Sequence, residues 1–96
     1  MTVKKINNLA LDIQKTPNHY WLNIEKQNKD SDSWYVISGF DYDEEYDKYQ
    51  LNSCLDRLDD KTIDWYDYGC LVNLGYKLLN GNKTLQEIYS DLESQV

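Results

Sequence analysis

The chain has the sequence HYWLNIEK at residues 19–26, in which apolar and polar side chains alternate. Successive side chains of a β-strand point to opposite faces of a sheet, so a period of two is typical of a strand with one buried face. Tyr20, Leu22 and Ile24 fall on one side of this strand, and Trp21, Asn23 and Glu25 on the other. The pattern predicts a half-buried strand.

A second stretch of strand-forming residues follows at 34–40, with the sequence WYVISGF. β-Branched and aromatic side chains predominate in it, as they do in strands. The segment between the two stretches, 27–33, is wholly polar and is expected to form a loop, so together they predict an antiparallel hairpin. Two alternatives stay open for the next segment: a third strand at 46–51 after a turn at 43–45, or a helix that begins near Asp43.

The N-terminal segment 3–15 has the apolar spacing of an amphipathic helix. Its apolar side chains follow the i, i+3, i+4, i+7 pattern, at Val3, Ile6, Leu9, Ala10 and Ile13. Thr2 is suitable as its N-cap. Pro17 disfavours helical backbone at the residue before it, so we expect this helix to end near Lys15.

The C-terminal half predicts helices near 52–58, 63–80 and 85–93. The motif Thr84-x-x-Glu87 is a capping box, which marks the start of the last of them. Gly81 is suitable for ending the helix before it. Gly69 and Gly75 lie inside that helix, where each glycine costs about 1 kcal/mol relative to alanine, so either another element packs closely there or the helix is kinked.

These elements predict an α+β fold with an N-terminal helix, an antiparallel two- to three-stranded sheet and two to three C-terminal helices. The 96 residues are expected to form a single compact domain, 1–96. We expect the core to contain the apolar residues on the inward faces: Ile6, Leu9, Ile13, Leu22, Ile24, Val36, Ile37, Leu55, Leu58, Leu71, Leu74, Leu78, Ile88 and Leu92.

The composition predicts no catalytic residue, no metal, no cofactor and no enzymatic activity. A structural zinc site needs about four ligands, and the chain has two cysteines and one histidine. Without a secretion signal, Cys54 and Cys70 are expected to be free thiols. The segment Asp41-x-Asp43-x-Glu45 begins like a calcium-binding loop, but Tyr46 replaces its glycine and Asn52 its final glutamate.

The net charge is −7, and residues 41–68 account for all of it, with ten acidic and three basic side chains. A polyanionic nucleic acid or an anionic membrane repels such a surface, so we expect no direct binding to either. The chain has neither a signal-type apolar core nor an apolar run long enough to span a bilayer. We therefore expect a cytoplasmic protein of a bacterial host with a basic partner.

Aromatic side chains interleave with the acids of this segment. A face that is merely solvated needs charge but no tyrosine, whereas a face that binds a basic groove uses both, because acids attract Arg and Lys and aromatics supply desolvated contact. The partner is therefore expected to be a basic nucleic-acid-binding protein, such as a nuclease. The predicted partner-binding residues are Asp41, Tyr42, Asp43, Glu44, Glu45, Tyr46, Asp47, Tyr49, Asp64 and Asp67.

Two short stretches are similar to stretches of a known family: Tyr35-Val36-Ile37-Ser38, and Asn80-Gly81 followed by Glu87-x-Tyr89-x-Asp91-Leu92. With these stretches and its expected order of elements, the chain resembles the small acidic phage-encoded anti-CRISPR proteins that inhibit type II-A nucleases. In that family the densest acids lie near the last helix, whereas here they follow the second expected strand. The resemblance implies a stoichiometric inhibitor that mimics nucleic acid and blocks a CRISPR effector. The alternatives are an immunity protein that neutralises a nuclease toxin, and a small phage structural or regulatory protein whose acidic face only solubilises it.

Overall fold

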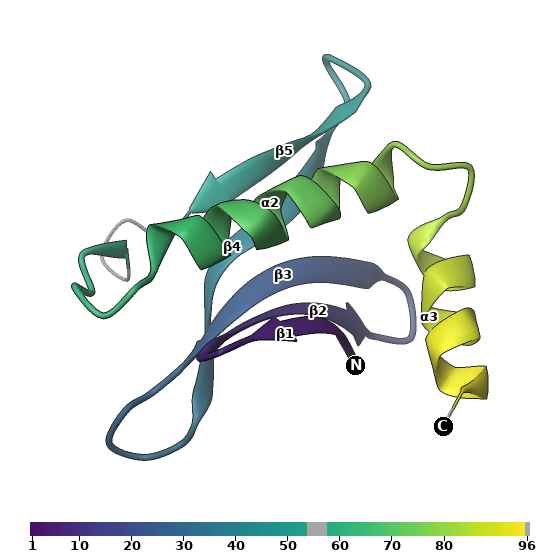
Figure 1. Ribbon diagram of the computed structural model, residues 1–96. Coiled ribbons are helices and arrows are strands. Elements are labelled where there is room, and N and C mark those ends of the chain that lie inside the picture. Colours follow the sequence, from purple (N-terminus) through teal and green to yellow (C-terminus); the bar gives the residue numbers. More distant parts are fainter. Residues whose placement is uncertain (54–57, 96) are drawn as a thin grey trace.

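The computed structural model describes residues 1–53 and 58–95 (Figure 1). Five consecutive antiparallel strands form one sheet, in which each strand pairs with its neighbours in sequence, and two helices follow in the described part of the chain. The elements are β1 (Thr2–Ile6), β2 (Leu9–Lys15), β3 (Tyr20–Gln27), β4 (Trp34–Asp43), β5 (Lys48–Ser53), α2 (Trp65–Leu79) and α3 (Leu85–Ser94). The fold is α+β, but its sheet is larger than the sequence predicted.

The predicted N-terminal helix over 3–15 is wrong, because this segment forms the hairpin of β1 and β2. Ile6 pairs with Leu9, so two residues make the turn, and the first of them, Asn7, has a φ of 54°. Asparagine tolerates this left-handed conformation better than most non-glycine residues. β2 is buried on both faces, with Ala10 only 4% exposed between fully buried leucines, and this double burial produced the spacing that predicted a helix.

The prediction of two to three strands is also wrong, because β1, β2 and β5 extend the sheet to five. The strands expected at 19–26 and 34–40 are present as β3 and β4. Beyond them the chain turns and returns as β5, which pairs with β4 from Asp43–Lys48 to Ser38–Ser53. The structure therefore has a strand rather than a helix after the turn. The helix expected at 52–58 begins in strand residues and otherwise lies mostly outside the described residues.

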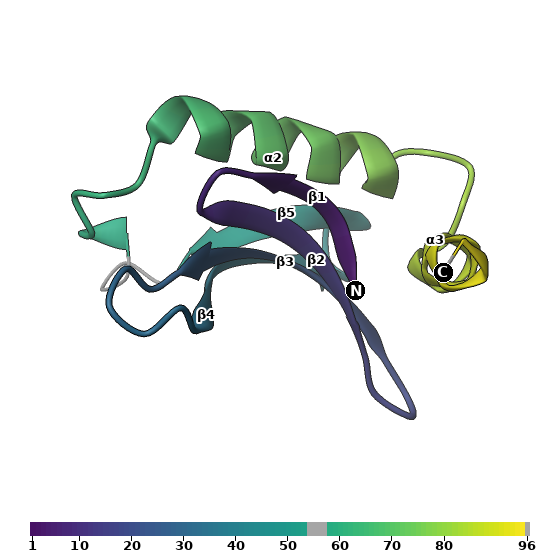
Figure 2. The same cartoon turned by 60° about the horizontal axis from the view of Figure 1, so that its bottom comes forward.

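One helix covers a face of the sheet and the other lies at its end. Figure 2 shows α2 lying across one face, while α3 stands at the end of the sheet and the opposite face carries neither helix. α2 begins at its N-cap, Asp64, whose side chain accepts hydrogen bonds from the backbone of Tyr66 and Asp67. α3 begins with the expected capping box of Thr84 and Glu87. Among the described residues, no helix is long and apolar enough to cross a membrane.

The core lies between α2, α3 and the face of the sheet that they cover, which we call the helix face. Most of the predicted core residues are buried there or pack against it, whereas Leu55 lies outside the described residues. Val36 is an exception, since it is only half-buried and pairs with Glu25 on the opposite face. The register shifts at this point, and the consecutive residues Ile37 and Ser38 are both fully buried. The core also contains residues that the sequence did not predict: Leu11, Phe40 and Ile63.

Gly75 is where α2 approaches the sheet most closely. A Cβ atom at Gly75 would lie 2.6 Å from Cε2 of the Phe40 ring, whereas a Cβ at Gly69 would meet nothing within 4 Å. Of the two explanations for the helix glycines, close packing therefore holds for Gly75. Near these residues, Cys70 is a free, half-buried thiol, and Cys54 lies outside the described residues.

The two glycines are expected to respond oppositely to alanine. Gly75→Ala should lower the free energy of unfolding by about 1–3 kcal/mol, because the new methyl group overpacks against Phe40. Gly69→Ala should raise it by about 1 kcal/mol, since alanine is the better helix former and the site is open. Urea unfolding followed by circular dichroism measures both. A stabilising Gly75→Ala substitution would contradict the packing described here.

Candidate functional site

The distal part of the β4–β5 hairpin, residues 41–49, carries most of the predicted partner-binding residues and projects beyond the rest of the sheet (Figure 1). Its turn comprises residues 44–47, and Asp47 has a φ of 50°. The Asp43 carboxylate accepts a hydrogen bond of 3.0 Å from the backbone N–H of Glu45, which closes the start of the turn. Apart from the half-buried Asp43 and Tyr49, every residue of this segment is exposed.

Strand alternation separates the acids from the tyrosines on this hairpin. Tyr42 and Tyr49 are register partners that continue the helix face, and their rings pack edge to face with centroids 5.2 Å apart. Asp41 and Asp43 point to the other side, because neighbouring residues of a strand face opposite ways. The Asp41 carboxylate accepts a hydrogen bond from the side chain of Asn52. The hairpin therefore has one acidic and one aromatic face.

Both faces of the hairpin are accessible. Tyr42 is 47% exposed and Tyr46, in the turn, is 61% exposed. The ammonium group of Lys48 lies 5.5 Å from the centroid of the Tyr46 ring, and Lys48 is the one cation of a segment that holds five carboxylates. The hairpin thus combines strong negative charge with solvent-exposed aromatic surface.

The structure places Asp64 and Asp67 at the opposite end of the sheet from the hairpin turn. Asp64 is the N-cap of α2, and Asp67 is 9% exposed and accepts a hydrogen bond of 2.9 Å from Asn7 in the β1–β2 turn. Both carboxylates therefore have structural partners. Of the ten predicted residues, the structure brings the eight between positions 41 and 49 together and leaves these two apart.

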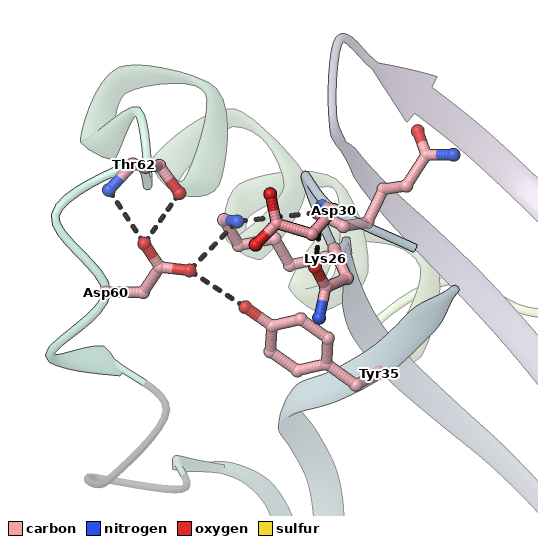
Figure 3. Close-up of polar contacts among 7 residues, drawn as sticks. Lys26, Asp30, Tyr35, Asp60 and Thr62 are labelled. Atoms are coloured by element: carbon pink, nitrogen blue, oxygen red, sulfur yellow. Dashed lines mark hydrogen bonds and ion pairs between the residues drawn. The ribbon is translucent and has the colours of Figure 1, made fainter. Parts of the chain in front are cut away.

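A polar cluster that the sequence did not predict surrounds Lys26 (Figure 3). Lys26 lies on the helix face of β3, and its side chain is only 2% exposed. Its ammonium group is 2.9 Å from Asp60, which also accepts a hydrogen bond of 2.9 Å from the Tyr35 hydroxyl. The other Asp60 oxygen accepts hydrogen bonds from the backbone N–H and the hydroxyl of Thr62. The cluster lines a hollow of about 230 Å³.

The environment of this cluster keeps Lys26 and Asp60 charged. Hydrogen bonds from Thr62, and then from Lys26, hold the pKa of Asp60 well below its usual range. Burial lowers the pKa of Lys26, but the hydrogen bond to Asp60 and the nearby charges outweigh burial and leave that pKa raised. The ion pair between Lys26 and Asp60 therefore ties the segment before α2 to the sheet.

One signal for this cluster was present in the sequence. The alternation in β3 places Lys26 on the same face as two core residues, Leu22 and Ile24. A buried lysine requires a charged or hydrogen-bonding partner. Its partner, Asp60, is 34 residues away in the sequence, and no local pattern identifies it.

Replacing Asp60 by asparagine is expected to lower the free energy of unfolding by about 3 kcal/mol, because it leaves the buried ammonium of Lys26 without its counter-ion. Folding depresses the pKa of Asp60. Its contribution to the free energy of unfolding is therefore fully present above the ordinary carboxyl pKa of about 4, and is lost as the pH falls through the pKa of Asp60 in the folded protein. The penalty of Asp60→Asn should therefore shrink in acid. Urea unfolding from neutral to acidic pH tests this.

Asp59→Asn is the matched control, because it makes the same charge change at an exposed neighbouring residue. It should leave the free energy of unfolding within about 0.5 kcal/mol of the original value. If Asp60→Asn were as mild as this control, the ion pair would not anchor the segment.

The face of the sheet opposite α2, which we call the open face, carries a second polar group. Glu25 accepts a hydrogen bond of 3.2 Å from Gln14, which in turn accepts one of 3.1 Å from Asn23. The carboxylate of Asp12 is paired with the ammonium group of Met1 at 2.9 Å. Burial, and then the negative charge of Asp12, raise the pKa of Glu25. Among the described residues, no three His, Cys, Asp or Glu side chains converge as metal ligands.

Neutralising Glu25 is expected to stabilise the fold. Since folding raises the pKa of Glu25, its charged form destabilises the folded state above that pKa, and this cost disappears as the pH falls below the unfolded value. Glu25→Gln should therefore raise the melting temperature at neutral pH and have little effect in acid. Differential scanning calorimetry at both pH values measures this, with Glu44→Gln on the exposed turn as control. A melting temperature lowered by Glu25→Gln at neutral pH would contradict the prediction.

Comparison with protein-family models, curated proteins and solved structures finds no match to this chain. The resemblance to the anti-CRISPR proteins also included an initial helix, and the structure has a β-hairpin there. The acidic and aromatic hairpin is the most distinctive part of the described surface.

Proposed function

We propose that this protein is a non-enzymatic inhibitor that inserts its β4–β5 hairpin into a basic nucleic-acid-binding groove of a nuclease and blocks it. The observation that carries the proposal is that one projecting hairpin holds five carboxylates, all exposed except the half-buried Asp43, together with the exposed Tyr42 and Tyr46. The resemblance to the anti-CRISPR proteins makes a type II-A nuclease the first target to test.

A groove fits this hairpin better than a flat surface does. Asp41 and Tyr42 point to opposite faces, and each is exposed. A flat partner would cover one face and leave the other in water. A groove with two walls contacts both, so its basic wall meets the carboxylates while the tyrosines pack against the other wall.

The two kinds of side chain have different tasks in this proposal. Exposed carboxylates attract a basic partner over distances near the Debye length of about 8 Å, and they raise the association rate. Tyrosines supply contact area at low entropic cost, and interface anchors of this kind slow dissociation. The proposed mimicry is therefore electrostatic, since carboxylates occupy the positions where the groove would bind phosphates.

The decisive variant changes the five hairpin acids to amides: Asp41→Asn, Asp43→Asn, Glu44→Gln, Glu45→Gln and Asp47→Asn. We expect its association rate with a guide-loaded type II-A nuclease to fall at least tenfold and its salt dependence to flatten, because electrostatic attraction is lost. Tyr42→Ala or Tyr46→Ala should instead accelerate dissociation, by about thirtyfold for a residue that contributes 2 kcal/mol. Biolayer interferometry at two salt concentrations measures both rates.

The matched control makes the same change of net charge away from the hairpin. It combines amide substitutions at the exposed acids Asp30, Asp32, Asp59, Asp91 and Glu93. The control should bind nearly as the original protein does, and target DNA should compete with both. If the association rate fell equally in the two variants, the effect would be one of net charge alone. If it did not fall in the hairpin variant, the hairpin acids would have a solubilising role only.

A further inference from the structure

The open face continues the acidic side of the hairpin onto the sheet. Trp21 lies on this face of β3, where it pairs with Gln14 of β2 and is 40% exposed. His19 contacts its ring edge to face, with centroids 5.3 Å apart. Neither α2 nor α3 lies over this face (Figure 2). The indole of Trp21 is therefore partly exposed to solvent beside a strand that leads to the hairpin.

The sheet register brings Asp41 to the same region. Leu22 and Phe40 are paired on the helix face, so their neighbours Trp21 and Asp41 both point to the open face, each one residue from that pair. Asp41 is exposed, and its Oδ2 accepts the hydrogen bond from Asn52. A carboxylate has about four lone-pair sites, so Asp41 retains capacity for a further donor.

Gly39 lies two residues before Asp41 on the same face of β4. Gly39 pairs with Asn23 on one side and Asn52 on the other. It has no side chain, and a Cβ atom there would lie 2.9 Å from Oδ1 of Asn23. The Asn23 side-chain amide therefore lies over the backbone of Gly39.

We infer that this part of the open face binds an arginine side chain of the partner at the rim of its basic groove. A planar guanidinium stacks on an aromatic face and at the same time donates two parallel hydrogen bonds to a carboxylate. Lysine has a compact charge that cannot do both with this geometry. Trp21 supplies the ring and Asp41 the carboxylate, and the negative charge of the hairpin suits the cation. This inference rests on the proposed function.

Octa-arginine and octa-lysine peptides are the probes, because they carry equal charge and differ only in the cationic group. The protein should bind octa-arginine at least fivefold more tightly, measured by isothermal titration calorimetry. Trp21→Ala should remove this preference without changing the affinity for octa-lysine, and Asp41→Asn should weaken it. Trp65→Ala is the control, since Trp65 is 56% exposed at the other end of the sheet, and it should retain the preference.

Equal affinity of the unchanged protein for the two peptides would overturn the arginine subsite and leave the proposed function intact. A preference that survives Trp21→Ala would likewise overturn it. Failure of both peptides to bind would contradict the subsite and also the proposed attraction to a basic groove. Circular dichroism spectra of the variants establish that each is folded.

Discussion

The contact between the Phe40 ring and the backbone of α2 at Gly75 marks the boundary between the buried core and the exposed hairpin. Up to Phe40, the helix-facing side chains of β4 lie beneath α2 and form the core. Two residues later the same row reaches Tyr42, which is 47% exposed. The aromatic face of the hairpin therefore continues the line of core side chains of β4 beyond the part of the strand that α2 covers. The site that we propose and the packing that stabilises the fold are consecutive parts of one strand.

Local features of the sequence predicted some elements and misled about others. The alternation at 19–26 and the capping box at Thr84 depend on neighbouring residues, and both appear in the structure. The apolar spacing over 3–15 was equally local, but it arose from a strand buried on both faces, and its helical period was coincidental. The turn at Asn7 was the overlooked signal, since an Asn-Asn pair suits a tight hairpin.

The candidate site shows the same division between local and long-range information. The acids and tyrosines of 41–49 are contiguous, so their grouping was predictable without knowledge of the fold. The segment around Asp64 and Asp67 also mixes acids with aromatic residues. In the structure, however, Asp64 caps α2 and Asp67 accepts a hydrogen bond from the β1–β2 turn. The pairing of Lys26 with Asp60, and the register that places Trp21 and Asp41 on one face of neighbouring strands, depend on chain reversals that no local pattern specifies.

The order of the strands determines how the chain can assemble. Every strand pairs with its neighbour in sequence, so each pairing closes only a short loop, and chains with such local contacts fold rapidly. Synthesis from the N-terminus presents the strands in their order in the sheet, but α2 emerges only after all five. Until then the apolar helix face has no cover. Transiently exposed apolar surface of this kind is prone to aggregation, and docking of α2 covers it.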